Sequence, residues 1–514
     1  MKLSFTPVIL SILALTMIAG SEGVAGVPPG QAGGTAPQGT HAAAVLDASM
    51  SFAEPYWDER VALLWSPNPV RETTGRVHRV RESGWYALGL LQRNHTGDSE
   101  RAVRVFEAIL TQQVAEPGAK WNGTFYKYPE EPTIPVNAVV WDDYDPNWRQ
   151  FVGTTLALAL INFEARIPED LRARMLHAIG RAADGEQADG RLNPTYTNIA
   201  LMHAFLCAFA GERLQRPDLA KAGAEYTEAV HAGFREHDTF EEYNSPTYYG
   251  VDFYGLALWR AHGVTPRMRV LGAELEAALW RDTAAFYHAG MRNLCGPFDR
   301  SYGMDMRKYV ALVGLWMRMG LDEDTAPFPP LDGPKDHVHD FFCAPCYVLL
   351  GVEIPADALA EFRKFSGERL VERTLPRNRR ASAWLAENVM LGAESAGLSR
   401  SIADAKSQYH PATIHWKTPA GSIGWMRLLR APRVDARAEK NRLTITAIGD
   451  TTFRLSAPGL NAADLTRERW TLPGLVVTVE TDAREFAAIP GTDFIDLSYR
   501  EATSFALRTD GGNR

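Results

Sequence analysis

A recurring pair of helical segments is the feature that most constrains the fold of this chain. Between about residues 76 and 368, a segment rich in apolar and aromatic residues is followed by an amphipathic one that often opens with an acidic or proline-containing cap. Alternation of this kind is what a closed ring of helices requires, because inner helices are covered on all sides while outer helices face water. We therefore predict an (α/α)6-type toroid of roughly six hairpins, the fifth with a weak partner. The expected segments are 79–93 with 99–115, 148–166 with 168–183, 196–212 with 217–236, 248–261 with 266–288, 304–319, and 341–352 with 355–365.

Short β-branched or aromatic segments replace this pattern after about residue 370 and predict a second domain. Gly, Pro, Asn and Asp divide them, as is typical of strands joined by turns. The fold class is therefore mainly α with a C-terminal antiparallel β-sandwich domain. Residues 382–391 are either its first strand or a final helix. The clearest strand segments are 422–429, 442–448, 452–455, 475–480 and 494–499.

The first residues have the pattern of a signal peptide. Lys2 precedes an apolar run from Pro7 to Ala19, which has about half the length needed to span a bilayer and ends in small residues. We predict a signal peptide over 1–25, a flexible leader over 26–45, the toroid over 46–370 and the β domain over 371–514. Export to the periplasm or outside the cell follows. No second run is long and apolar enough to anchor the chain in a membrane.

Composition and charge narrow the class of partner. Of 514 residues, 46% are hydrophobic and 10% aromatic, which is typical of a globular protein. The net charge of −8 and a pI near 6.0 argue against wholesale binding to nucleic acid or to an anionic membrane surface.

Cysteine and histidine offer little sign of a metal centre. Cys343 and Cys346 form a C-x-x-C motif without the second cysteine pair of a zinc site, so a local disulfide or buried thiols are the alternatives. His337 and His339, with Asp340, suggest a metal site, but alternating histidines in a loop are more often solvated or hydrogen-bonded. We expect no metal and no other cofactor.

The segment from Glu241 to Gly250 gathers two glutamates, an asparagine and three tyrosines just before an apolar helical run. A capped helix with core tyrosines explains Ser245 and Pro246. A capped helix does not explain the two glutamates or the asparagine. The segment is therefore interpreted as a functional loop with groups for proton transfer and sugar stacking.

Four further polar clusters precede or lie near the expected inner helices. Alone, each has an ordinary explanation: His203 is a core histidine, and Arg300 pairs with Asp299 or Asp305. If the ring closes, however, their loops meet at one end and form a cleft whose composition suits carbohydrate. The clusters are 141–149, 193–198 with His203, 292–305, and 408–416.

Export signal, helical toroid and C-terminal β domain together resemble the toroid-type polysaccharide lyases, including the heparinase II/III-like and alginate-lyase-like groups. Asn147-Trp148 is similar to the Asn-Trp pair that opens an inner helix in those lyases, and Tyr248 or Tyr249 lies where a catalytic tyrosine is expected. The chain departs from the pattern in having no Asn-His dipeptide nearby, only Asn198 and, five residues on, His203.

The resemblance implies β-elimination on a uronate-containing polysaccharide or oligosaccharide. Neutralising the uronate carboxylate makes the C5 proton removable, and a base and an acid complete the reaction. Under this hypothesis Asn147, Asn244 and Arg300 hold the carboxylate, while Tyr248 first and Tyr249 second serve as base and acid. The substrate-binding candidates are Trp141, Trp148 and Tyr302 as stacking platforms, with Asn198, His203, Glu242, Asp252, Asp305 and His410.

A glycoside hydrolase on the same fold is the main alternative. Such enzymes use paired carboxylates, and Glu241, Glu242, Asp252, Asp299 and Asp305 exceed what a lyase requires. A non-catalytic carbohydrate-binding protein is the third possibility, and an isomerase or epimerase also fits the fold.

Overall fold

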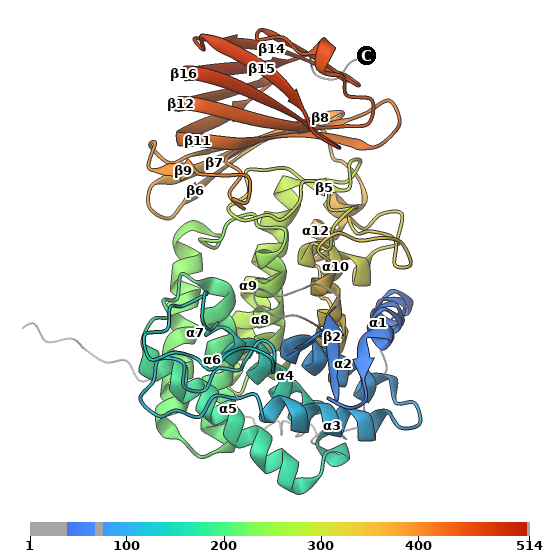
Figure 1. Ribbon diagram of the computed structural model, residues 1–514, viewed down its shortest axis with the longest axis vertical. Coiled ribbons are helices and arrows are strands. Elements are labelled where there is room, and N and C mark those ends of the chain that lie inside the picture. Colours follow the sequence, from blue (N-terminus) through green and yellow to red (C-terminus); the bar gives the residue numbers. More distant parts are fainter. Residues whose placement is uncertain (1–38, 67–75, 511–514) are drawn as a thin grey trace, which may run out of the picture. The chain divides into compact units, whose positions relative to one another are not determined.

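The computed structural model describes residues 39–66 and 76–510 (Figure 1). The expected signal peptide over 1–25 and most of the expected leader lie outside these residues. The end of that leader is a helix, because α1 spans Thr40–Ala53. Its buried residues Ala42, Val45, Leu46, Met50 and Ala53 recur at helical spacing. Among the described residues, no helix has the length and apolar character to cross a membrane.

Most of the predicted helical hairpins are confirmed. Four complete pairs are followed by three shorter helices (Figure 1). The fifth segment is shorter than expected, since its helix begins at Leu312 and not near 304. The helices are α2 (Val80–Arg93) and α3 (Asp98–Leu110), α4 (Trp148–Phe163) and α5 (Glu169–Asp189), α6 (Thr197–Arg213) and α7 (Pro217–His237), α8 (Tyr248–His262) and α9 (Pro266–Phe286), then α10 (Leu312–Gly320), α11 (Ala344–Leu350) and α12 (Ala356–Arg363).

The inner helices form a closed ring. Helices α2, α4, α6, α8 and α10 contact one another in that order, and α1 and α11 close the circuit between α10 and α2. The Ser49 hydroxyl of α1 donates a hydrogen bond to the carbonyl of Phe341, 292 residues further along the chain. Closure explains the two helix types: α6 is buried from Thr197 to Gly211, whereas the outer helix α7 buries one stripe of residues.

A close approach of two inner helices depends on Gly250 near the start of α8. A Cβ atom there would lie 2.2 Å from the Cβ of Leu312 at the start of α10, so a larger residue would push the helices apart. The two helices are also joined by a hydrogen bond, in which the indole N–H of Trp316 donates to the Gly250 carbonyl at 2.8 Å.

The C-terminal region is one antiparallel sheet of 11 strands in which the layers of the expected sandwich are continuous. Residues 382–391 belong to a strand hairpin, not to a helix. The second half of β11 crosses β7 and β8: Ala438 N–H donates to the Ser382 hydroxyl and Ala396 N–H to Asp435. The strands are β6 (Arg369–Leu375), β7 (Arg379–Ala386), β8 (Val389–Ser395), β9 (Arg400–Ile402), β10 (Ala412–Lys417), β11 (Ile423–Glu439), β12 (Arg442–Ser456), β13 (Arg469–Leu472), β14 (Leu475–Thr481), β15 (Glu485–Pro490) and β16 (Ile495–Thr509).

Short strands occur within the helical region as well. A three-stranded antiparallel sheet comprises β1 (Trp57–Asp58), β2 (Leu63–Ser66) and β3 (Val77–Arg79), and a hairpin pairs β4 (Tyr287–His288) with β5 (Asn293–Leu294). The helices and the first strands of the large sheet share one hydrophobic core, to which Leu375 and Met390 belong. The His288 ring also contacts the Ala386 carbonyl at 2.9 Å.

A fully buried arginine at the start of α4 fixes the long connection before it. Nη1 of Arg149 donates to Glu186 at 3.1 Å and to Asp189 at 3.3 Å, while Nε donates to the Asn122 carbonyl at 3.0 Å. The connection packs so closely that a Cβ at Gly185 would lie 2.0 Å from that same carbonyl. Arg149 therefore has a structural role and not one in a cleft.

Replacing Arg149 by methionine should lower the free energy of unfolding by about 3–5 kcal/mol, because the buried carboxylates lose a partner. The matched control is Arg174→Met, since Arg174 pairs with Glu107 on the surface at 3.2 Å with both side chains 49% exposed. Its expected cost is about 0–1 kcal/mol. Urea unfolding of both variants makes the comparison, and equal losses would contradict the assigned role.

Candidate active site

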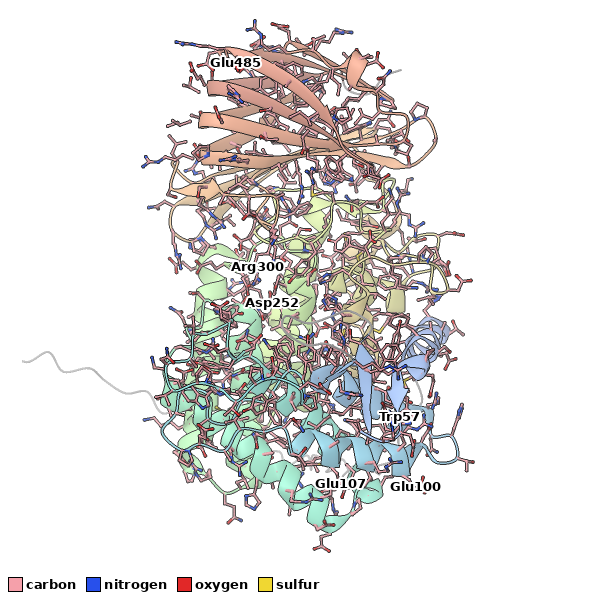
Figure 2. The ribbon with its side chains drawn as sticks, in the orientation of Figure 1. Trp57, Glu100, Glu107, Asp252, Arg300 and Glu485 are labelled. Atoms are coloured by element: carbon pink, nitrogen blue, oxygen red, sulfur yellow. The ribbon has the colours of Figure 1, made fainter. Side chains whose placement is uncertain are left out.

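A cavity of about 330 Å³ opens where the inner helices begin. Arg81 lies in the first turn of α2, while Trp148 and Tyr248 are the first residues of α4 and α8. Arg300 belongs to the segment after β5 and can be found in Figure 2. The expected convergence of loops is therefore observed. The lining comprises Arg81, Trp85, Trp141, Asp145, Asn147, Trp148, Phe151, Tyr196, Asn198, Thr247, Tyr248, Val251, Tyr254, Arg300, Tyr302, Leu312, His337, His339, Asp340, Cys343, Cys346 and Tyr347.

Tyr248 is held between a cation and a second phenol. Nη2 of Arg300 donates to its hydroxyl oxygen at 2.5 Å, and the guanidinium lies 3.6 Å from the centre of its ring. The Tyr302 hydroxyl is 2.8 Å from the Tyr248 hydroxyl. Burial raises the pKa of Tyr248, and the Arg300 charge opposes this rise. The site thus contains a phenol whose ionised form has two hydrogen-bond donors in place.

A buried acid stands behind Arg300. Glu242 accepts a hydrogen bond from Nη1 of Arg300 at 3.0 Å and another from the amide of Asn198. Burial raises the pKa of Glu242 although both partners lower it. Asp252 on α8, also labelled in Figure 2, is fully buried, and burial followed by the Glu242 charge raises its pKa well above its ordinary value.

Asn147 belongs to a separate polar network in the cavity wall. Its amide N–H donates to the Tyr196 hydroxyl at 2.8 Å, and its carbonyl accepts from Arg191 at 2.9 Å. The backbone N–H of Asn147 donates to Asp145 at 3.0 Å. Burial raises the pKa of Asp145 despite that bond. The amide is therefore oriented, with one N–H of its NH₂ group committed to Tyr196.

Aromatic rings form much of the remaining wall. The Arg81 guanidinium lies 4.5 Å from the ring centre of Trp148 and 4.6 Å from that of Trp85. Trp141 is 53% exposed and has a positive φ of 74°, a conformation that few non-glycine residues adopt. Exposed and stacked rings of this kind suit the apolar faces of sugar rings.

Comparison with known proteins places the chain in a family. Residues 43–351, more than half of the chain, match a family model described as a domain of unknown function, DUF8769. The chain belongs to the DUF8769 family. Residues 371–491 match a second domain of unknown function, DUF8770. No curated protein sequence matches the DUF8769 chain.

Several solved structures are similar to this DUF8769 chain, at low sequence identity. Heparinase III is 10% identical with a TM-score of 0.48 over 94% of this chain and 86% of that one. A chondroitin AC lyase variant from Streptomyces coelicolor A3 is 10% identical with a TM-score of 0.38 over 92% and 80%. A GH127 β-L-arabinofuranosidase from Geobacillus stearothermophilus T6 is 10% identical with a TM-score of 0.31 over 92% and 99%. Similarity at this level of identity and TM-score does not indicate which reaction the chain catalyses.

Two predicted catalytic residues of the DUF8769 chain lie outside the cavity lining. The Tyr249 hydroxyl is fully buried, 2.7 Å from the Thr239 hydroxyl and 3.2 Å from Asp282. Neighbours in a helix point about 100° apart, so only one of two adjacent tyrosines faces the cavity. Asn244 has a φ of 46° and donates to two carbonyl oxygens at 2.8 and 2.9 Å, those of Cys295 and Pro297. It shapes the loop and does not contact the cavity.

Five predicted substrate-binding residues are likewise absent from the lining. His203 is buried beside Gln187 and edge-on to Tyr226, and His410 is buried 3.2 Å from the Ser301 carbonyl. Asp305 is bound to Arg307 at 3.3 Å. Glu242 and Asp252 complete this group, and Glu242 instead lines a neighbouring cavity together with Glu241 and Asp299. The predicted residues that do line the cavity are Asn147, Trp148, Trp141, Asn198, Tyr248, Arg300 and Tyr302.

Four of the five acids proposed for hydrolysis are paired with arginines, and the fifth, Asp252, is fully buried. Glu241 contacts Arg377 at 2.8 Å, and Asp299 contacts Arg400 at 2.7 Å and Arg379 at 3.2 Å. None of the five lines the cavity. The carboxylates that do are Asp145 and Asp340.

Sequence reasoning overlooked Arg81 and gave Tyr196 no role. A usable signal existed, because both lie at the start of an expected inner helix, as Trp148 and Tyr248 do. Arg81 also precedes Trp85 by one helical turn, which is the spacing of a stacked pair.

Two buried histidines should make the fold acid-labile. Burial lowers the pKa of His203 to about 4 and that of His410 to about 3, whereas an unfolded histidine has a pKa of about 6.5. Between these values the unfolded chain binds more protons, so the free energy of unfolding falls as the pH falls. Each histidine contributes up to about 1.4 kcal/mol per pH unit in that window.

Urea unfolding at pH 7 and pH 5 measures this effect. His203→Gln should reduce the loss of stability between the two pH values, and the exposed His95→Gln should leave it unchanged. If the parent, His203→Gln and His95→Gln all lose the same stability between pH 7 and pH 5, buried His203 is not a cause of the acid lability.

Proposed function

We propose that this chain is a carbohydrate-active enzyme, a polysaccharide lyase that cleaves a uronate-containing polysaccharide or oligosaccharide by β-elimination. The observation that carries the proposal is the placement of the Tyr248 hydroxyl between Arg300 and Tyr302 in the cavity wall. None of the acids that hydrolysis was expected to use lines this cavity, and all but Asp252 are paired with arginines, which supports elimination over hydrolysis.

An anionic substrate suits the electrostatics of the cavity. Arg81 and Arg300 both line it, and first-turn residues of α2, α4 and α8 bring the positive ends of three helices towards it. Backbone N–H groups at helix starts favour anions. A uronate carboxylate would meet these charges, with the remaining N–H of Asn147 as a further donor.

In the proposed step, ionised Tyr248 takes the proton from C5 of the uronate. The electron pair forms the C4–C5 double bond, and the C4–oxygen bond breaks. The departing oxygen takes a proton from the newly formed Tyr248 phenol or from Tyr302, so charge and atoms balance. Arg300 stabilises the phenolate that starts the cycle, which offsets part of the rise in pKa caused by burial. Tyr302 takes the acid role that the sequence had suggested for Tyr249.

Tyr248→Phe should reduce turnover by a factor of roughly a hundred or more, because it removes the proton-transfer group and keeps the ring. The assay follows ultraviolet absorbance of the conjugated uronate product on a panel of acidic polysaccharides. Saccharide binding, measured by calorimetry, should change little. Tyr249→Phe is the control, since its hydroxyl lies outside the cavity, and its activity should be near that of the parent.

Hydrolysis by Asp145 and Asp340 is the second candidate. Both line the cavity, and their environments push their pKa values apart, which is the pattern of an acid and base pair. Burial raises the pKa of Asp145. For Asp340 burial also raises the pKa, but His337 and further positive charges more than offset it. Reducing sugar without the ultraviolet signal, abolished by Asp145→Asn and retained by Tyr248→Phe, would establish hydrolysis and reject the lyase. Saccharide binding without either product would favour a binding protein.

We also propose that the chain is exported, which would bring it to extracellular or periplasmic polysaccharide. The apolar run from Pro7 to Ala19 and the small residues after it support cleavage in the region from Gly20 to Gly26. Mass spectrometry of exported protein should find an N-terminus in or just after that region. A membrane-bound protein that begins at Met1 would contradict the proposal.

A further inference from the structure

His337, His339 and Asp340 form a compact cluster in the cavity wall, just before and within the short 3-10 helix Val338–Cys343. Each offers one potential metal-ligand atom, and the three atoms lie within 4.8 Å of one another. Nothing in the proposed β-elimination uses them.

The distances approach those of a tetrahedral zinc site. Nε2 of His337 lies 3.2 Å from one carboxylate oxygen of Asp340, and Nε2 of His339 lies 3.6 Å from the other. Ligand atoms around Zn²⁺ at bond lengths of about 2.0–2.2 Å are about 3.3 Å apart. Each contact is near this spacing but involves a different carboxylate oxygen, so one side chain would turn to share the ion. His339, whose side chain is 37% exposed, has room to do so.

Packing orients the imidazole rings. Tyr302 stacks on His337 with ring centres 3.9 Å apart, and the His339 ring meets His337 edge-on at 3.9 Å. Asp340 is only 9% exposed, which limits the positions its carboxylate can take. Support of this kind fixes ligand direction in metal sites.

The number and type of donors indicate the ion. Two imidazole nitrogens and one carboxylate oxygen match the three protein ligands of catalytic zinc sites, whereas Mg²⁺ and Ca²⁺ prefer oxygen alone. All three residues line the cavity, so a fourth position would face it.

We propose that His337, His339 and Asp340 bind one Zn²⁺ ion and leave an open coordination position towards the cavity. That position takes water or an oxygen atom of a bound saccharide. This proposal departs from the metal-free expectation drawn from the sequence. It does not depend on the lyase chemistry and would also fit a binding protein with the same wall.

The test uses the full chain without a histidine tag, stripped with a chelator and dialysed. Calorimetric titration with Zn²⁺ should give one ion per chain. His339→Ala should weaken Zn²⁺ binding by more than roughly 100-fold. Loss of a group that only orients a ligand costs up to about 100-fold in metal affinity, so loss of a ligand itself should cost more. His41→Ala is the matched control: that side chain is 38% exposed and lies 3.3 Å from Asp322, yet it should bind like the parent.

Thermal unfolding distinguishes a loss of Zn²⁺ binding from misfolding of a variant. Zn²⁺ should raise the Tm of the parent and of His41→Ala, because an ion that binds only the folded chain stabilises it, and should not raise that of His339→Ala. His337→Ala repeats the test should His339→Ala fail to fold. Absence of stoichiometric Zn²⁺ binding by the parent, or equal binding by the histidine variants, would overturn the proposal.

Discussion

Closure of the helical ring is the constraint on which the rest of this structure depends. The inner helices α4, α6 and α8 are buried around almost their whole circumference, so each needs a neighbour on both sides. An open row of such helices would leave large apolar faces in water at its two ends. Helices α1, α10 and α11 cover those ends. With the walls apolar, polar groups gather where the helices begin, which places the candidate site there.

Arg300 links the electrostatics of that site. Its guanidinium contacts the acid Glu242, the phenol of Tyr248 and, through Nε, the side chain of Gln408 at 3.2 Å. A change of charge at Glu242 therefore alters the field at Tyr248 without direct contact. Asp252 adds to this coupling, since its own pKa responds to the Glu242 charge. The Glu242 charge therefore acts on both Asp252 and the Tyr248 phenol.

The hairpins and the meeting of loops could be predicted from sequence because both rest on periodicity. The sequence could not show, however, which face of its helix a particular residue occupies. Helix α8 is apolar on every side, so nothing in its pattern distinguishes Tyr248 from Tyr249, and the same holds for His203 in α6. Helix α1 was missed because its alanine-rich sequence continues the composition of the segment before it. Glu241 and Asp299 form ion pairs with Arg377 and Arg400 and so do not line the cavity. These arginines are distant in the sequence, so only the tertiary structure shows that they are partners.

The contact between Ser49 and Phe341 has a consequence for how this chain folds. Helix α1 is synthesised first, and its partner at Phe341 lies 292 residues further along the chain. Synthesis of that stretch takes roughly 15–60 s at about 5–20 residues per second. During that time one apolar face of α1 and the open edge of α2 have no native cover. Long-range contacts of this kind slow folding and expose the intermediate to aggregation. Assembly of this ring is therefore expected to be late, cooperative and dependent on protection of its first helix.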